Sequence, residues 1–196
     1  MKARVPALTP LLRSNAQGDI LALLFMNEDQ EFSLADITRR VDALPATVHR
    51  EVQRLVDSGV VLDRFVGRSR LIRTNVEHEF HRPLSDLLLA SYGPKVLLQD
   101  LVATLPGVEA AYIYGSWAAR YLGENGPVPR DVDVLIVGTT GRDLIEDMAR
   151  LAEARLGREV NATRVSPDDW AQAGSAFVTT IRSRPLVALS QTKATP

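Results

Sequence analysis

The sequence contains no cysteine and only three histidines among its 196 residues. The absence of cysteine excludes disulfide bonds, thiolate zinc sites and cysteine nucleophiles. Three histidines make a histidine-rich metal site an unfavourable interpretation. These absences remove several classes of functional site before any motif is considered.

Long apolar runs are also missing. Lys2 and Arg4 have no sustained apolar stretch behind them, so we expect no signal peptide, no membrane partner and a cytoplasmic location. The net charge of -1 gives no overall bias toward nucleic acid, although local patches can exist. With 45% hydrophobic and 24% charged residues, the composition is that of an ordinary globular protein. The length suits one large or two small domains.

The first part of the chain predicts helices and then a hairpin. Ser33 is an expected helix N-cap with Asp36 as its capping-box partner, Pro45 suits the first turn of a helix, and Gly59 suits its end. The predicted elements are a helix over 17–25, a short helix after Ser33, a helix from Pro45 to Gly59, and strands over 60–65 and 70–74.

This order of elements, with the stretch "SLADITRRVDALPATVHREVQRLVDSGVV", resembles a winged helix-turn-helix of the bacterial arsenic-repressor type. The resemblance implies double-stranded DNA as the partner, with the third helix in the major groove and the hairpin as the wing. A homodimer on a pseudo-palindromic site is a further expectation. The residues expected to contact DNA are Thr47, His49, Arg50 and Gln53 on the helix, and Arg68 and Arg70 on the hairpin.

Charge supports the same interpretation. Residues 39–73 contain eight arginines against four acids, a surplus that suits a surface facing phosphates. The alternatives are that these arginines form an ordinary solvated surface, or that the unit docks protein. His49 is as compatible with a surface position without function as with a base or phosphate contact.

Residues 77–92 predict a connecting helix, which would pack the two halves together or form a dimer contact. A metal site of Glu77, His78 and His81 is disfavoured because nothing nearby completes a ligand set. Tyr92-Gly93-Pro94 is the predicted domain boundary.

The second part alternates strands and helices. Strands are predicted over 108–114, 132–137 and 158–165, helices over 95–105, 116–121, 142–156 and 175–182, with a short helix opening at Pro167 and a short apolar segment over 185–189. The strand over 132–137 is almost entirely apolar, as expected when both faces of a sheet are covered.

Two polar features lie at the ends of strands in this part. Gly115-Ser116 follows the first strand and begins a helix, where backbone N–H groups and a hydroxyl can receive a phosphate. Asp131 and Asp133 alternate with Val132, so both carboxylates should lie on one face of their strand. Two carboxylates can share Mg²⁺ (or Mn²⁺) with the phosphates of a nucleoside triphosphate.

Gly115, Ser116, Arg120, Asp131 and Asp133 together resemble the motif of the minimal nucleotidyltransferase domain of the polymerase-beta superfamily. The two parts joined in one chain look like a prokaryotic family described both as transcriptional regulators and as nucleotidyltransferase-domain proteins. The resemblance implies nucleotide binding by Gly115, Ser116 and Arg120. It implies metal binding and catalysis by Asp131 and Asp133.

The sequence departs from that motif in three ways. Arg130 replaces a small polar residue before the first aspartate, and the loop before it is longer than in compact members. The third acid expected on the next strand is replaced by Asn161. Asn161 can offer a neutral oxygen but cannot take a proton, and Glu159 could substitute only in a shifted register. The alternative to a nucleotide site is a plain α/β fold whose acids cap a loop.

We therefore expect an α+β protein: a winged helix-turn-helix over 1–76, a connecting helix over 77–92, and a small mixed-sheet α/β nucleotidyltransferase-like domain over 93–196. The first functional hypothesis is a DNA-binding transcriptional regulator that senses a nucleotide or transfers it weakly. The second is an active nucleotidyltransferase that moves NMP to a hydroxyl of a protein, an RNA end or a small molecule. The third is an antitoxin-like binding protein.

Overall fold

The computed structural model describes residues 6–124, 126 and 128–191. The chain divides into two compact units, Met1–Gly93 and Pro94–Pro196. Both helices and strands contribute, so the protein is of the mixed α+β class, as expected. Within the described residues, no helix has both the length and the apolar character needed to cross a bilayer.

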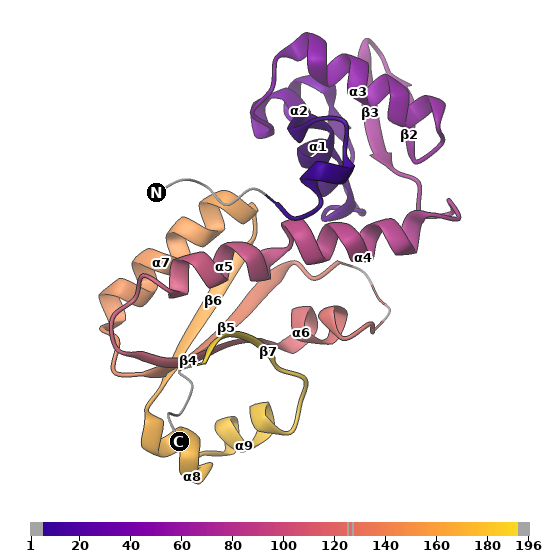
Figure 1. The fold of residues 1–196 in the computed structure, drawn as a ribbon. Coiled ribbons are helices and arrows are strands. Elements are labelled where there is room, and N and C mark those ends of the chain that lie inside the picture. Colours follow the sequence, from indigo (N-terminus) through magenta and orange to yellow (C-terminus); the bar gives the residue numbers. More distant parts are fainter. Residues whose placement is uncertain (1–5, 125, 127, 192–196) are drawn as a thin grey trace. The chain divides into compact units, whose positions relative to one another are not determined.

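The first unit is helical with a small sheet (Figure 1). Its sheet has the strand order β1-β3-β2, all antiparallel. Buried side chains from α1, α2, α3, β3 and α4 form one core, which includes Phe25, Ile37, Val52, Ile72 and Leu88. The elements are η1 (Thr9–Leu11), α1 (Asn15–Phe25), β1 (Phe32–Ser33), α2 (Leu34–Arg40), α3 (Pro45–Asp57), β2 (Val61–Val66), β3 (Ser69–Thr74) and α4 (His81–Tyr92).

Local sequence signals explain several of these boundaries. The Ser33 hydroxyl accepts from the N–H of Asp36, whose carboxylate accepts from the N–H of Ser33, so the predicted capping box begins α2. Pro45 occupies the first turn of α3, and Gly59 follows its end with φ +76°, a backbone conformation that glycine adopts without strain. The two-residue strand β1 was not predicted from the sequence.

The helix predicted over 77–92 begins later, at His81, and belongs to the first unit. Pro83 gives the physical reason. In a helix starting at residue 77 it would lie in the interior and remove a hydrogen bond, whereas in α4 it lies in the first turn, where no donor is needed.

The second unit is a four-stranded sheet between helices. Its strand order is β6-β5-β4-β7, with β5 and β6 parallel and the other neighbours antiparallel. Figure 1 shows α5 and α7 on one face of the sheet and α8 and α9 on the other. The elements are α5 (Pro94–Val102), β4 (Val108–Tyr114), α6 (Gly115–Tyr121), β5 (Asp131–Gly138), α7 (Arg142–Leu156), β6 (Glu159–Val165), α8 (Pro167–Gln172), α9 (Ala176–Arg182) and β7 (Val187–Gln191).

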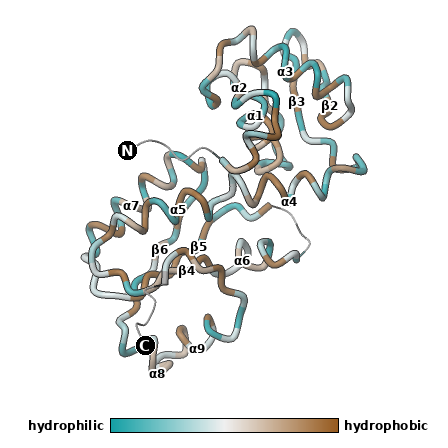
Figure 2. The backbone as a smooth tube through the Cα atoms, viewed as in Figure 1, coloured by the Kyte–Doolittle hydropathy of each residue, from teal (hydrophilic) through white to brown (hydrophobic). Residues whose placement is uncertain are grey.

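Strand β5 is the centre of this unit. Figure 2 shows hydrophobic residues along β4 and β5. Every residue from Val134 to Gly138 is buried. Leu135 and Val137 pack against Val178 and Ile181 of α9 on one face. Asp131 and Asp133 continue that same face beyond the apolar core, so the fold places both carboxylates at the open end of a rigid strand.

Candidate functional site

The first candidate surface is the outer side of α3. His49 and Arg50 are exposed, and Thr47 and Gln53 are partly exposed, while Val48, Val52 and Leu55 are buried on the opposite side. The predicted DNA-contacting residues of the helix therefore share its accessible side. Gln53 is not free to turn, because it donates to Asp57 and accepts from Arg70.

The two arginines expected at the hairpin tip have different environments. Arg68 is exposed in the two-residue turn between β2 and β3. The side chain of Arg70 is only 13% exposed, forms an ion pair with Asp63 at 2.6 Å and donates to Gln53 Oε1 at 2.9 Å. Arg70 therefore ties the hairpin to α3, whereas Arg68 is exposed in the turn.

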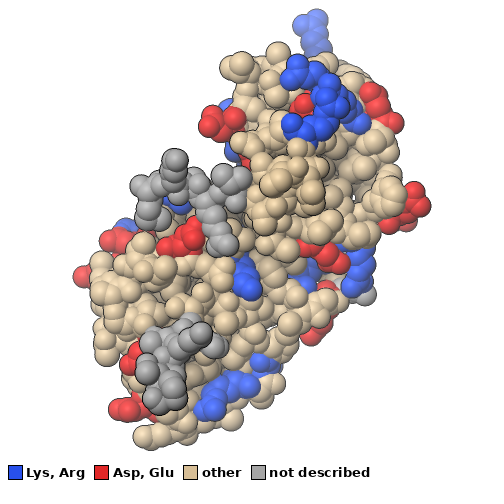
Figure 3. All heavy atoms as spheres, in the orientation of Figure 1, with Lys and Arg blue, Asp and Glu red and all other residues tan. Residues whose placement is uncertain are grey.

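Ion pairing also reduces the local positive charge. Arg39 pairs with Asp36, and Arg64 pairs with Glu31 at 2.5 Å; both acids lie just before the segment counted above. Residues 31–73 contain the same eight arginines but six acidic residues. Figure 3 still shows Lys and Arg side chains gathered over this unit, in the region of α2 and α3. The basic surface is smaller than the sequence indicated, and it depends on residues such as Arg50 and Arg68.

The three residues weighed as a metal site lie on different elements, because Glu77 and His78 precede α4, which begins at His81. His81 lies 3.2 Å from a carboxylate oxygen of Glu28 and stacks on Phe25, with ring centroids 5.5 Å apart. In the described parts of the chain, no group of three or more His, Asp or Glu side chains is placed to hold a metal ion.

The second candidate site is the acid pair of β5. In the parallel pairing with β6, Asp131 lies opposite Glu159 and Asp133 lies opposite Asn161. The Asn161 side-chain amide donates to Asp131 Oδ2 at 3.1 Å and lies 3.5 Å from Asp133 Oδ1. Both carboxylates therefore share one face, as predicted, and Asn161 contacts both of them. Glu159 is the ladder partner of Asp131 and shares this face, but it is exposed at the first position of β6, and Asn161 is the β6 side chain that contacts both carboxylates.

Burial raises the pKa of the Asp133 carboxyl above its ordinary value, and the negative charge of Asp131 raises it further; the Asn161 amide opposes both effects. The pKa of the Tyr114 hydroxyl is also raised, mainly by burial, with the two carboxylates adding to the effect and a hydrogen bond with Thr163 opposing it. Two neighbouring carboxylates, one of them partly buried, are only partly compensated by the Asn161 amide, so a bound cation would be favoured between them.

Gly115 brings the predicted phosphate loop against this pair. Tyr114 pairs with Asp133 across the β4–β5 ladder, and Gly115 follows with φ +68°. A Cβ atom at Gly115 would lie 2.6 Å from Asp133 Oδ2. Only glycine therefore combines this backbone conformation with such a close carboxylate.

Ser116 and Arg120 line a hollow of about 590 Å³ beside this loop, together with Gly115 and Arg184. The Arg120 guanidinium donates to the carbonyl of Gly126 at 2.6 Å, and one carboxylate, Glu124, also lines the hollow. Sequence reasoning missed Arg184, which lies in the loop between α9 and β7, far along the chain from the motif. A lone arginine in a loop carries no sequence signal that could have found it.

Arg158 fixes the loop that precedes the acid pair. Its guanidinium donates to the carbonyl of Pro129 at 2.5 Å and lies 5.7 Å from the ring centroid of the buried Trp117. Arg130 stands between this anchor and Asp131. The long loop is thus held to β6 at its end, which helps to position the first carboxylate.

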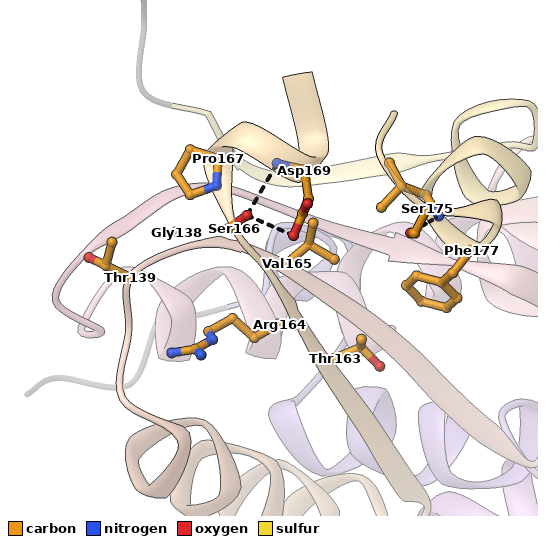
Figure 4. A pocket seen from close by; sticks show the side chains of 11 residues that line it. Gly138, Thr139, Thr163, Arg164, Val165, Ser166, Pro167, Asp169, Ser175 and Phe177 are labelled. Atoms are coloured by element: carbon orange, nitrogen blue, oxygen red, sulfur yellow. Dashed lines mark hydrogen bonds between the residues drawn. The ribbon is translucent and has the colours of Figure 1, made fainter. Parts of the chain in front are cut away.

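A second hollow, of about 490 Å³, lies at the opposite ends of β5 and β6 (Figure 4). Thr163 and Phe177 line it, as do Ser166 and Ser175, which begin the short helices α8 and α9. The Ser166 hydroxyl is engaged with Asp169, and the Ser175 hydroxyl accepts from the N–H of Val178. These hydroxyls serve as helix caps, so the acid pair remains the stronger candidate for chemistry.

Comparison with known proteins identifies no relative: no protein-family model, no curated protein and no solved structure matches the chain.

Proposed function

We propose that the protein is a cytoplasmic DNA-binding transcriptional regulator whose second unit binds a nucleoside triphosphate with Mg²⁺. The first unit would be a winged helix-turn-helix that places α3 in the major groove. This is supported by the joint exposure of Thr47, His49, Arg50 and Gln53 on α3 and by the exposed Arg68 beside it.

The proposal that the second unit binds a nucleotide rests on one observation: the Asn161 amide contacts both carboxylates and so holds them together on one face. Asp131, Asp133 and phosphate oxygens are the hard oxygen ligands that suit one Mg²⁺ ion. The triphosphate would lie along Gly115 and Ser116, with Arg120 and Arg184 as its cations. Because α6 has only seven residues, we assign most of the phosphate attraction to the metal and the arginines.

Binding without efficient transfer is the expected behaviour of such a site. Two-metal transfer needs acids that hold both ions and activate the attacking hydroxyl. Asn161 supplies no charge, and Glu159, opposite Asp131 at the start of β6, is exposed to water. The hypothesis of an efficient nucleotidyltransferase is therefore second, and no contact among the described residues favours the antitoxin hypothesis.

Calorimetry of the full chain with ATP, GTP, CTP and UTP, with and without Mg²⁺, tests the nucleotide half. We expect Mg²⁺-dependent binding of at least one nucleotide, lost in the double variant Asp131→Asn, Asp133→Asn. The matched control is Asp143→Asn with Asp147→Asn, which removes two carboxylates from the exposed side of α7. Equal nucleotide affinity in wild type and the Asp131/Asp133 variant would refute the two-carboxylate site.

The DNA half is tested by titrating a mixed-sequence 40-base-pair duplex at low salt. We expect binding that weakens steeply as salt rises, because phosphate contacts release counterions. If the protein does not bind the duplex even at low salt, the proposal of DNA binding is refuted.

A further inference from the structure

The β2–β3 hairpin leaves two large apolar side chains uncovered, Phe65 and Val66, of which Phe65 is the larger and the more exposed. Residues directly opposite in an antiparallel pair share a face, and alternate residues along a strand return to that face. Val61, Asp63 and Phe65 therefore share a face with their partners Thr74, Ile72 and Arg70. At the base of the hairpin this face is fully packed, with Val61 and Ile72 at 0% exposure, whereas Phe65 near the tip is 69% exposed.

The same face adjoins the outer side of α3. Arg70, directly across from Phe65, reaches Gln53 of α3 at 2.9 Å. Phe65 therefore projects from the hairpin beside the side of α3 that carries the proposed DNA contacts. Because Arg70 is also bound to Asp63, the position of the hairpin relative to α3 is fixed and does not depend on a ligand.

Two exposed arginines of the same unit indicate which kind of partner Phe65 contacts. Arg68 lies in the adjoining turn, and the side chain of Arg50 on α3 is 59% exposed. A single exposed ring is too small for a protein interface, which needs about 800 Å² on each partner. Cations beside an apolar wedge suit the DNA minor groove, where inserted phenylalanine side chains partly unstack a base step.

We propose that Phe65 is an apolar contact which the β2–β3 hairpin inserts into the minor groove of duplex DNA, between partly unstacked base pairs. This inference rests on the proposed DNA binding of the first unit. It adds a residue that charge and helix motif do not supply, and it implies that the protein distorts the duplex that it binds.

The test compares full-length wild type with Phe65→Ala on a mixed-sequence 40-base-pair duplex containing 2-aminopurine at scattered positions. We expect Phe65→Ala to weaken binding roughly tenfold, the effect of losing one aromatic–base stack. The slope of log K against log salt should not change, because no charge is removed. The 2-aminopurine fluorescence that rises on unstacking should rise with wild type and not with Phe65→Ala.

Val66→Ala is the matched control, because Val66 is also exposed, at 49%, but faces the other side of the hairpin. It should behave as wild type. Phe65→Trp should keep binding, with tryptophan emission quenched by the duplex, which guards against a folding defect in the alanine variant.

The outcomes separate the inference from the function on which it rests. If wild type binds no duplex, both fail. If wild type binds and Phe65→Ala binds equally well with the same fluorescence rise, only the role of Phe65 fails. If Phe65→Ala instead converts a dimer to a monomer in sedimentation, the ring is a subunit contact and the inference is overturned.

Discussion

The Asn161 amide partly compensates the negative charge of Asp131 and Asp133. Asn161 lies within hydrogen-bonding distance of both Asp131 and Asp133, in the place where a third carboxylate would complete a two-metal site. Its amide protons partly neutralise the two acids but cannot accept a proton from an attacking hydroxyl. In the proposed site, the identity of this residue would therefore decide between nucleotide binding alone and efficient transfer.

We predict that Asn161→Asp tightens Mg²⁺-dependent nucleotide binding and raises any transfer activity, whereas Glu159→Gln changes neither. The loss of a catalytic base typically lowers a rate by about 10²- to 10⁴-fold, so the gain can be of that order if the rest of the site is intact. Single-turnover assays with labelled nucleoside triphosphates compare the three proteins. A fast wild type that Glu159→Gln abolishes would identify Glu159 as the third acid.

The raised pKa of Asp133 predicts a stability effect with a definite sign. The folded protein binds this proton more tightly than the unfolded chain, so the contribution of Asp133 to stability falls as pH rises from its ordinary value of 3.8 through the raised pKa. At neutral pH Asp133→Asn should therefore unfold at higher urea concentration than wild type, by less than about 1 kcal/mol because water screens a partly exposed group.

The measurement is urea denaturation in EDTA between pH 3.5 and 7.5. The advantage of Asp133→Asn should shrink toward the acid end, because the unfolded chain also takes up this proton as the pH falls below the ordinary value of 3.8. Asp86→Asn, an exposed position in the interior of α4, is the control and should follow wild type throughout. A destabilised Asp133→Asn at pH 7 would contradict the electrostatic account.

At the scale of elements, the β2–β3 hairpin and α3 behave as one surface because Arg70 joins them. Arg70 contacts Asp63 on its own hairpin and Gln53 on the helix. Arg68, two residues earlier, lies in the turn and is exposed. Replacing Arg68 and replacing Arg70 should therefore affect different properties, duplex binding in the first case and stability in the second.

We predict that Arg68→Ala weakens duplex binding for all sequences and lowers the salt slope by about one, with no change in stability. Arg70→Ala should instead lower the free energy of unfolding by about 1–3 kcal/mol, because it leaves partly buried acceptors unpaired. Fluorescence anisotropy over a salt series and urea denaturation measure the two effects. Equal stability of the two variants would show that the Arg70 contacts contribute little.

At the scale of the whole molecule, two compact units each have their own core. A regulator that senses a nucleotide must couple its two ligands. We predict that a saturating nucleoside triphosphate with Mg²⁺ changes the duplex affinity by about 5- to 150-fold, and that duplex changes the nucleotide affinity by the same factor. Anisotropy gives the first factor and calorimetry gives the second.

The Asp131→Asn, Asp133→Asn variant should keep duplex binding but lose its response to nucleotide. The wild type could instead bind nucleotide without any change in its duplex affinity. That result would remove nucleotide sensing from the proposed function but leave both binding activities in place.

The sequence by itself determined most elements of this fold, because their signals are local. Ser33 with Asp36 marked the start of α2, Pro45 marked α3, and apolar period alone defined β4 and α7 with the bounds that the structure has. It also placed Asp131 and Asp133 on one face, because side chains alternate along any strand.

Only the tertiary structure decided which side chains meet. The choice between Asn161 and Glu159 depends on the register of β6 beside β5, which is set by packing across the intervening α7 and not by either strand alone. The pairing of Arg70 with Gln53 and the position of Arg184 beside Gly115 and Ser116 likewise bring together residues distant in sequence. Such contacts depend on the three-dimensional path of the chain, so they leave no pattern in the local sequence.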